Sequence, residues 1–456
     1  MVDEFDIVVE QFVTAKSPVS VKAAAGCGKT EAIVRAVALS TGKQLVLTHT
    51  NAGVAALRSR FRKHHVPVSQ YQVDTIASWL LKYASAYPSM SNLAVAKPQG
   101  NDWGEVYPAA QKLFSYAFLE NVLMASYDGV YIDEYQDCTQ LQHAIALRLC
   151  NFLPVRVLGD PLQGIFDFCD PIVDWQTDVL PTFNPTPDLT QPYRWQNSNP
   201  ELGKQLGDIR TKLLNHEPVD INLYPEINWQ PWSENSEIEV CKYVKAHKRG
   251  TIAGIHYWPD DAHRTAKGLN GLYQSIEEMD CKELMTTVRR IDEWLLQENF
   301  TAIISGIKNL TMKACAERSI FSDKEYLKKE FEQLQNGDLS IVPKIIDSIT
   351  NDIGKKVYRK ELLNEMKNTF QEFSTEKYSS IYEAAFAARY RTRVNGRKPE
   401  NRIISRTLLI KGLEFNHAIV LNADKLQNQK NFYVAITRGS ESLTILSSSP
   451  LLNLDK

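Results

Sequence analysis

Ala23-Ala24-Ala25-Gly26-Cys27-Gly28-Lys29-Thr30 lies between a short apolar run, Val19-Ser20-Val21, and a segment with helical apolar spacing, residues 31–38. An apolar strand, a loop of small residues ending in Gly-Lys-Thr, and a helix in this order are typical of a phosphate-binding loop. Small side chains let backbone N–H groups approach phosphate oxygens, and the helix N-terminus adds partial positive charge. The pattern predicts a parallel α/β domain built around this loop.

The side chains of this loop have distinct predicted roles. The ammonium of Lys29 can reach the β- and γ-phosphates of a nucleotide, and the hydroxyl of Thr30 can ligate Mg²⁺. The first position of such loops is usually Gly, and here it is Ala23. We therefore expect ATP and Mg²⁺ as the bound groups. The loop residues predicted to bind them are Ala25, Gly26, Cys27, Gly28, Lys29 and Thr30.

Composition limits the classes of protein to be considered. The 456 residues are too many for one hydrophobic core, so two or three domains are expected. No apolar run approaches membrane-spanning length, and the start Met1-Val2-Asp3-Glu4 differs from a signal peptide, so we expect no membrane partner. The seven cysteines form no Cys-x-x-Cys pair, which indicates neither zinc nor an iron–sulfur cluster and favours a cytoplasmic location. The net charge of −2 does not favour nucleic acid, although a motor needs only a local basic track.

An acidic pair follows an apolar strand farther along the chain. Val130-Tyr131-Ile132 delivers Asp133 and Glu134 at its carboxyl end. Asp133 would hold Mg²⁺, and Glu134 would orient and deprotonate an attacking water. Adjacent acids at a strand end are otherwise often part of a turn. Behind a phosphate-binding loop, the catalytic interpretation is favoured.

A further apolar strand also ends in a polar turn. Residues 155–159 precede a tight turn with Gln163, whose amide could sense the γ-phosphate. Phe166 and Phe168 follow. They could be core aromatics, or they could stack on bases, which aromatic faces hold without sequence choice.

Polar side chains also lie near the expected edge of the sheet. Residues 44–48 form an apolar strand that runs into Thr48-His49-Thr50-Asn51, at the carboxyl edge where parallel sheets bind ligands. Thr75 stands at the start of a later helix. Gln11, upstream of the phosphate-binding loop, could read the edge of adenine or could be a solvated helix residue.

The order of these segments resembles one family. Ala-x-x-Gly-x-Gly-Lys-Thr, Thr-x-Thr-Asn, Asp-Glu-x-Gln-Asp and Gly-Asp-x-x-Gln resemble the successive motifs of superfamily 1 helicases of the UvrD/Rep/PcrA type. The second half agrees, with Gln191-Pro192-Tyr193-Arg194, Lys411-Gly412-Leu413-Glu414-Phe415 and Tyr433-Val434-Ala435-Ile436-Thr437-Arg438. The Lys-Gly-Leu-Glu-Phe string is the most family-specific. The resemblance covers residues 19–195 and 403–447.

The resemblance implies further roles. Tyr193 would stack on adenine, Arg194 would reach the γ-phosphate, and Arg438 would be a second arginine finger. Glu414 would contribute to nucleotide binding. The track would be single-stranded or partly duplex DNA, followed from 3′ to 5′. The residues implied in DNA binding are Thr48, His49, Asn51, Thr75, Phe166, Phe168 and Lys411.

Several positions depart from the family pattern. His49 replaces an aromatic residue that usually stacks on a base, and Phe168 replaces a common Trp. Cys169 stands where Arg often follows, and Leu408 occupies the position of a His. The departures leave the predicted ATPase centre complete, whereas several predicted strand contacts are altered.

The expected fold class is α/β, with two RecA-like parallel-sheet domains forming an ATP cleft. The expected boundaries are 1–190 for the first domain with a small insertion at 82–118, 191–261 and 395–456 for the second domain, and 262–394 for a mostly helical insertion. Arg194 and Arg438 would approach the phosphates from the second domain. A basic run from Arg389 to Arg406, with only Glu400 opposing it, could be a solvated loop or a phosphate contact.

Three functions fit these patterns. The first is an ATP-driven translocase or helicase on single-stranded DNA, acting within a larger DNA-processing or defence complex. The second is a DNA- or nucleotide-sensing ATPase subunit that regulates a partner nuclease and unwinds little. The compact size resembles the helicase-like subunits of Gabija-type anti-phage systems, which would imply an OLD-type nuclease partner. A small-molecule kinase or GTPase is disfavoured by Arg438, by the Lys-Gly-Leu-Glu-Phe string and by the absence of an Asn-Lys-x-Asp motif.

Overall fold

The computed structural model describes residues 4–94, 98, 103–166, 171–277, 282–314, 327–351, 355–395, 400–426 and 428–454 of the chain. The chain divides into two compact units. Unit 1 comprises residues 1–226, 427–442 and 451–456, and unit 2 comprises residues 227–426 and 443–450. None of the described helices is both long and apolar enough to cross a bilayer.

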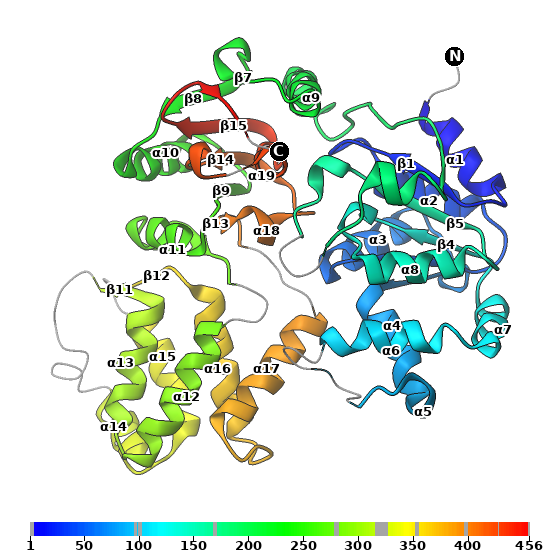
Figure 1. Ribbon diagram of the computed structural model, residues 1–456. Helices are drawn as coiled ribbons and strands as arrows, with labels where there is room; N and C mark the ends of the chain where they lie inside the picture. The colour runs from blue at the N-terminus through cyan, green and yellow to red at the C-terminus, as the bar shows by residue number, and fades with distance from the viewer. Residues whose placement is uncertain are drawn as a thin grey trace. The chain divides into compact units, whose positions relative to one another are not determined.

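Unit 1 is built on a six-stranded sheet in the order β3-β2-β4-β5-β1-β6, with every neighbouring pair parallel (Figure 1). Its strands are β1 (Val19–Lys22), β2 (Gln44–Thr48), β3 (Tyr71–Thr75), β4 (Gly129–Ile132), β5 (Val155–Gly159) and β6 (Asn184–Pro185). The carboxyl ends of parallel strands share one edge of the sheet. The loops after β1, β2, β4 and β5 are therefore neighbours.

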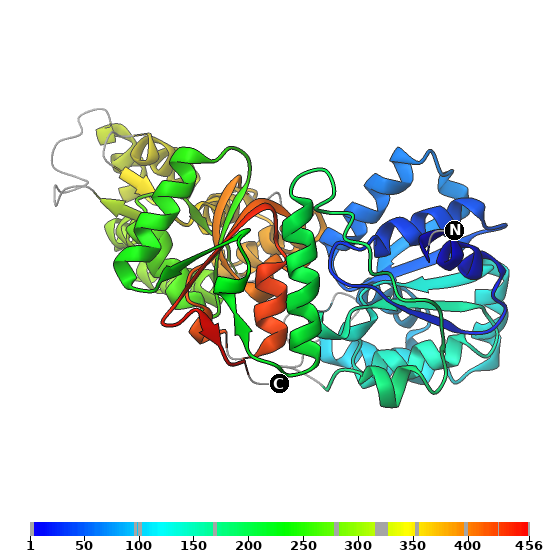
Figure 2. The ribbon, with the colours of Figure 1, turned by 90° about the horizontal axis from the view of Figure 1, so that it is seen from above.

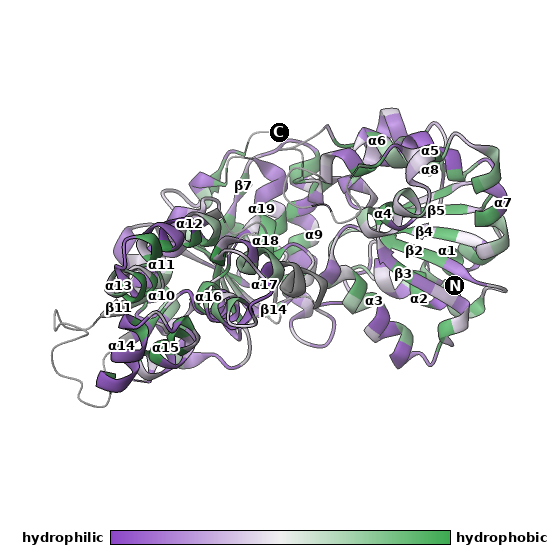
Figure 3. Ribbon diagram, turned by 90° about the horizontal axis from the view of Figure 1, so that it is seen from below, coloured by the Kyte–Doolittle hydropathy of each residue, from purple (hydrophilic) through white to green (hydrophobic). Residues whose placement is uncertain are grey.

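Helices cover both faces of this sheet (Figure 2). One face packs against α1 (Glu4–Thr14), α2 (Lys29–Leu39) and α3 (Asn51–Lys63); the other packs against α4 (Ile76–Ala86), α6 (Trp103–Leu113), α7 (Ala117–Ser126) and α8 (Gln140–Leu149). Successive strand residues alternate between the two cores: Leu45 and Leu47 join the second, whereas Val46 joins the first. Because both faces are covered, the inner strands β2, β4 and β5 are mostly hydrophobic, as the green on them in Figure 3 shows.

The described part of the predicted insertion, residues 82–94 and 103–118, is mostly helical. It includes the end of α4, the short α5 (Pro88–Ser91), α6 and the start of α7. Val106, Ala109, Ala110 and Leu113 recur at helical spacing and are buried in the core shared with α4 and α8. The segment is thus a helical addition to one face of the sheet.

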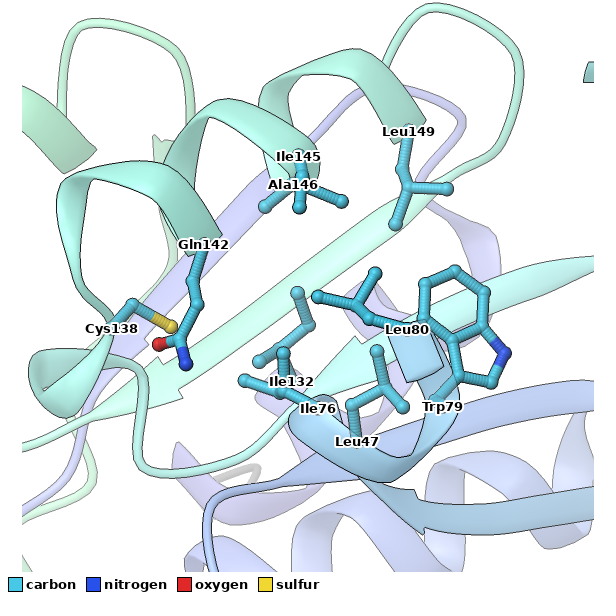
Figure 4. Close-up of a pocket in the computed structure, with 10 residues that line it drawn as sticks. All are labelled: Leu47, Ile76, Trp79, Leu80, Ile132, Cys138, Gln142, Ile145, Ala146 and Leu149. Atoms are coloured by element: carbon cyan, nitrogen blue, oxygen red, sulfur yellow. The ribbon is translucent and has the colours of Figure 1, made fainter. Parts of the chain in front are cut away.

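A small apolar cavity lies inside this second core (Figure 4). Its lining residues come from β2, β4, α4, α8 and the turn before α8: Leu47, Ile76, Trp79, Leu80, Ile132, Cys138, Gln142, Ile145, Ala146 and Leu149. The lining is almost wholly apolar, so the cavity belongs to the core.

The rest of unit 1 follows the sheet or returns from the end of the chain. It contains the short helical turns η3 (Tyr135–Asp137) and η4 (Pro161–Gln163), helix α9 (Pro200–Leu214), the antiparallel pair β7 (Val219–Asp220) and β16 (Leu451–Leu452), and helix α19 (Gln429–Ile436). Helix α19 packs against both η4 and α9.

Unit 2 contains a second six-stranded sheet in the order β10-β13-β9-β14-β15-β8. Its strands are β8 (Ile227–Pro231), β9 (Ile252–His256), β10 (Gln274–Ser275), β13 (Arg402–Arg406), β14 (Phe415–Val420) and β15 (Gly439–Ser447), of which the last begins in unit 1. Strands β10, β13, β9 and β14 pair in parallel, as do β15 and β8. Helices α10 (Glu234–His247), α11 (Pro259–Gly268) and α18 (Thr407–Ile410) accompany it. The predicted fold class, α/β with two RecA-like parallel sheets, is confirmed.

A helical body is inserted between β10 and β13. It consists of α12 (Lys282–Leu296), α13 (Phe300–Thr311), α14 (Lys328–Gln335), α15 (Val342–Thr350), α16 (Lys360–Phe373) and α17 (Ile381–Asn395), with a hairpin of β11 (Met312–Ala314) and β12 (Lys355–Val357). Its helices share one apolar core. The helical insertion was predicted, whereas its exact boundaries stay a prediction.

Arg389, the first residue of the basic run, lies near acids from outside the run. The guanidinium is buried within the helical body, and Nη1 lies 3.8 Å from a carboxylate oxygen of Glu361 and 3.6 Å from one of Glu365. Both acids lie on α16, which packs against α17. The fold thus adds two acids of α16 to Glu400, the one acid within the run.

Candidate nucleotide-binding site

The predicted phosphate-binding loop lies at the carboxyl end of β1. Gly26 and Gly28 have φ angles of +69° and +89°, in the left-handed region that favours glycine. A Cβ on Gly26 would lie 2.7 Å from the Trp195 ring, so a side chain would not fit there. Helix α2 begins at Lys29, and its N-cap Gly28 offers no side-chain hydrogen bond to the first turn. Such a helix N-terminus favours an anion.

Two side chains of the loop, Lys29 and Cys27, are buried. Lys29 is only 8% exposed, and its Nζ donates to the Ala23 carbonyl oxygen at 3.0 Å, which holds the ammonium against the loop. Burial raises the pKa of the Cys27 thiol to about 11. Cys27 is therefore a neutral loop residue at physiological pH rather than a reactive thiolate.

The acidic pair follows β4 directly. Asp133 is 5% exposed, and its Oδ1 accepts a hydrogen bond of 2.9 Å from the Glu134 N–H. Burial, and next the Glu134 carboxylate, raise the pKa of Asp133 to about 7, so that a nearby cation would favour its charged form. The Thr30 hydroxyl and the Asp133 carboxylate are oxygen ligands of the type Mg²⁺ prefers. These residues fit the predicted metal.

Gln136 fixes the orientation of Glu134. Its Nε2 donates to Glu134 Oε2 at 2.6 Å, and its Oε1 accepts from the Asp160 N–H at 2.9 Å. Glu134 itself has a φ of 55°, which is uncommon outside glycine and costs conformational energy. Gln136 therefore connects the loop after β4 to the loop after β5. The sequence placed Gln136 inside a motif without giving it a role.

The predicted sensor Gln163 and the predicted arginine finger Arg438 are in direct contact. Arg438 Nη2 lies 3.3 Å from Gln163 Oε1, and the arginine is 1% exposed. Its Nε also donates to the Val434 carbonyl oxygen at 2.9 Å, and its Nη2 to Thr437 Oγ1 at 3.1 Å. The guanidinium is thus held at a fixed position beside η4.

Arg194 joins the same group of residues. Its backbone N–H donates to the Gly26 carbonyl oxygen at 3.1 Å, and its Nη1 donates to the Thr437 carbonyl oxygen at 2.6 Å. The next residue, Trp195, donates from Nε1 to the Gly439 carbonyl oxygen at 2.8 Å. These bonds tie the segment after β6 to both the loop and the end of α19.

The position of the two arginines differs from the expectation. The motifs led us to place Arg194 and Arg438 on a second domain, yet both belong to unit 1 together with the phosphate-binding loop. The reason is that α19 packs against η4 and α9, although strand β15, which follows it, continues into the second sheet. The predicted domain boundaries stay a prediction.

An aromatic pair flanks the loop. The rings of Phe5 and Tyr193 meet edge to face with centroids 5.8 Å apart, and a Cβ on Gly28 would lie 3.0 Å from Phe5 and 3.4 Å from Tyr193. Tyr193 was predicted, whereas Phe5 was not. Only its place at the start of an amphipathic helix could have suggested it.

Gln11 lies elsewhere on the same helix. It is exposed, and the carbonyl of its neighbour Phe12 accepts from Nε of Arg156, near the start of β5. That position is toward the amino end of the strands, opposite the phosphate-binding loop. The structure does not bring Gln11 to the loop, and its contact with adenine stays a prediction.

The residues predicted to bind DNA in unit 1 lie after β2, β3 and η4. Thr48 is buried, and His49 is half-buried with its Nε2 3.6 Å from Cys138 Sγ. Asn51 begins α3, and Phe166 is half-buried. Phe168 and Cys169 lie outside the described residues.

The other residues predicted for the site are Thr75, Lys411 and Glu414. Thr75 is the N-cap of α4, where its Oγ1 accepts from the Ser78 N–H at 3.1 Å, so that its local contact is structural. Lys411 follows α18 and is half-buried, whereas Glu414 is exposed just before β14. Both belong to unit 2.

One group among the described residues has the geometry of metal ligands. His263, Glu277 and Glu283 bring one ligand atom each within 4.8 Å of one another. Arg359 forms an ion pair with both glutamates, donating from Nε to Glu277 Oε1 at 2.6 Å. The Arg359 guanidinium thus already neutralises the two acids of this group.

A scan against protein-family models and a search of curated proteins found no match. Among solved structures the chain is similar to the Pif1 helicase from Bacteroides in complex with ADP-AlF3 and ssDNA, with 11% identity, a TM-score of 0.42, and coverage of 99% of this chain and 93% of that chain. It is also similar to the arterivirus nonstructural protein 10 (helicase), with 10% identity, a TM-score of 0.37, and coverage of 98% and 62%. The complex of that helicase with DNA gives 10% identity, a TM-score of 0.36, and coverage of 98% and 63%. The chain thus spans less than two thirds of the arterivirus chain. These likenesses assign no activity.

Proposed function

We propose that this protein is an ATP hydrolase related to superfamily 1 helicases that uses the energy of hydrolysis to move along single-stranded DNA from 3′ to 5′. The observation that carries the proposal is a chain of hydrogen bonds that links an oriented acid, a glutamine and two arginines and reaches the phosphate-binding loop through Arg194. Gly26 contacts Arg194 through its carbonyl, Gln163 contacts Arg438, and Gln136 joins the Glu134 and Gln163 loops.

Each group has a part in the proposed reaction. Lys29 and the N–H groups at the start of α2 bind the phosphates, while Tyr193 and Phe5 offer aromatic surface to the base. Glu134, held by Gln136, accepts the proton of the attacking water. Arg194 and Arg438 stabilise charge on the transferred phosphoryl group. Mg²⁺ held by Thr30 and Asp133 would neutralise phosphate charge.

A short connection supports coupling between DNA and hydrolysis. His49 lies in the loop after β2, next to the loop after β4, and its ring contacts Cys138. Cys138 is only four residues from Glu134, and η3 is the segment between them. A DNA strand that binds against His49 and displaces its ring would therefore also displace the segment that carries the proposed base.

The alternative function, a DNA- or nucleotide-sensing ATPase that regulates a partner nuclease, has one observation in its favour. The residue in the family's base-stacking position, His49, is half-buried against Cys138, which leaves less surface for a base. A Gabija-type arrangement with an OLD-type nuclease, in the cytoplasm, would use such a subunit. Duplex unwinding measured beside ATP hydrolysis separates the two functions, because only the first predicts unwinding.

The proposed motor should hydrolyse ATP faster in the presence of single-stranded DNA. The acceleration should shrink as salt is added, because phosphate contacts release condensed counterions when they form. The measurement is the steady-state ATPase rate against oligonucleotide concentration at two ionic strengths, with double-stranded DNA and RNA as comparisons. An ATPase rate that no nucleic acid changes would contradict the proposed motor and favour the ATPase that regulates a partner nuclease.

Gln136→Ala tests the orientation of the proposed base. Because Gln136 contacts Glu134 and not the phosphate-binding loop, the substitution should lower kcat about 10- to 100-fold, as expected for a misplaced catalytic group. KM for ATP should stay within about threefold. Gln140→Ala is a matched control, since Gln140 Nε2 contacts Asp178 on the exposed surface at 2.8 Å. An unchanged kcat in Gln136→Ala would show that the bridge does not position the base.

A further inference from the structure

Asp160 is a fully buried carboxylate that holds two side chains from separate elements. Its Oδ2 accepts from Gln163 Nε2 at 2.8 Å, and its Oδ1 accepts from Arg210 Nη1 at 2.8 Å. The Leu162 N–H also donates to Oδ1 at 3.3 Å. Arg210 comes from α9, fifty positions after Asp160, and its side chain is 16% exposed. No motif in the sequence contains Arg210.

Arg210 also contacts the aromatic ring of α19. Its guanidinium carbon lies 5.4 Å from the centroid of the Tyr433 ring, within the range of a cation–π interaction. Burial alone would lower the pKa of Arg210, but the Asp160 carboxylate and then Tyr433 raise it overall, so the group stays charged. The Tyr433 hydroxyl accepts from the Ala25 N–H at 3.2 Å, inside the phosphate-binding loop.

Three chains of contact therefore start from the Asp160–Arg210 pair. The first passes through Gln163 to Arg438. The second passes from the Asp160 N–H through Gln136 to Glu134. The third passes through Tyr433 to the loop. The pair thus connects the proposed finger, the proposed base and the phosphate-binding loop.

We propose that Arg210 is a positioning residue for the hydrolysis of ATP, acting through Asp160 on Gln163 and Arg438 and through Tyr433 on the phosphate-binding loop. The inference rests on the proposed function. The requirement is for arginine, because its planar group can pair with a carboxylate and lie against a ring at once, whereas lysine offers a point charge. Arg210→Lys should keep the charge opposite Asp160 and lose the fixed geometry.

The test is a double-mutant cycle in ATP hydrolysis with the full chain. Arg210→Lys should lower kcat about 10- to 100-fold with KM for ATP changed less than about threefold. In a Gln163→Ala background, where the link to Arg438 is already broken, the same substitution should have a clearly smaller effect on kcat. Lys204→Ala is the control on the same helix, because Lys204 forms an exposed pair with Glu201. Its kcat should match that of the wild type.

Melting temperature is measured on each preparation, because breaking one partner of a buried ion pair can unfold a protein. If Arg210→Lys does not fold, the neutral double variant Asp160→Asn/Arg210→Gln takes its place, since it leaves no buried charge without its partner. It should fold and show the same loss of kcat. A folded variant with wild-type kcat, or an equal loss of kcat in both backgrounds, would overturn the positioning role. A wild-type protein that hydrolyses no ATP would instead overturn the proposed function itself.

Discussion

Glu134→Gln is expected to bind ATP and to turn it over 10²- to 10⁴-fold more slowly, roughly the contribution of a general base. In the wild-type protein, Gln136 Nε2 lies 2.6 Å from Glu134 Oε2. The substituted side chain keeps its size and can still contact Gln136. An amide, however, cannot accept the proton of the attacking water. The phosphate-binding loop and Lys29 are unchanged, so binding should persist. Single-turnover hydrolysis and binding of a fluorescent ATP analogue, measured on the same preparation, separate the two steps.

Two control variants make the result specific. Lys29→Ala should lose nucleotide binding, because its ammonium is the positive charge held against the loop. Glu120→Gln should behave like the wild type, since Glu120 pairs with Arg148 at 3.0 Å outside the site. If Glu134→Gln hydrolyses ATP at nearly the wild-type rate, Glu134 is not the base.

Arg438→Ala should reduce hydrolysis on the order of a thousandfold, the scale of effect associated with arginine fingers. The side chain is buried beside Gln163 and is held by carbonyl and hydroxyl oxygens of α19 and Thr437. Lys29 and the Asp133 carboxylate are kept in this variant, so ATP binding should weaken only modestly. Arg438→Lys should restore little, because Lys lacks the planar group. Arg194→Ala should follow the same pattern.

A purely structural role for Arg438 predicts a different outcome. The variant would then melt at a lower temperature and retain normal turnover per folded molecule. Melting temperature and ATPase rate from one preparation distinguish these outcomes. A destabilised but fully active Arg438→Ala protein would show that Arg438 does not act on the phosphoryl group.

The sequence was sufficient for the features that short-range geometry controls. The phosphate-binding loop needs small residues, positive φ angles at two glycines and a helix that starts at Lys29, and all of these are written within eight consecutive positions. The acids after β4 are placed by the end of one strand. Apolar runs likewise predicted the parallel sheets, because strands covered on both faces are mostly hydrophobic.

Sequence reasoning is weakest where a residue's position depends on distant partners. Packing of α1 on α2 brings Phe5 to the loop, which the sequence did not suggest, while the contact of Gln11 with adenine stays a prediction. The hydroxyl of Thr75 caps α4, and its contact with DNA likewise stays a prediction. Arg194 and Arg438 were placed on a second domain, and packing of α19 places them with the loop.

The tertiary structure alone decided how the site is held together. Arg438 meets Gln163 across 275 positions, and Tyr433 meets Ala25 across 408. Arg210 stands in an ordinary helix with no motif around it, and only the fold of α9 against η4 and α19 gives its charge a partner in Asp160. A sequence motif reflects the local backbone geometry. A buried charge, in contrast, is stabilised by an opposite charge or hydrogen bond from a residue that can lie anywhere in the sequence, so only the fold identifies that partner.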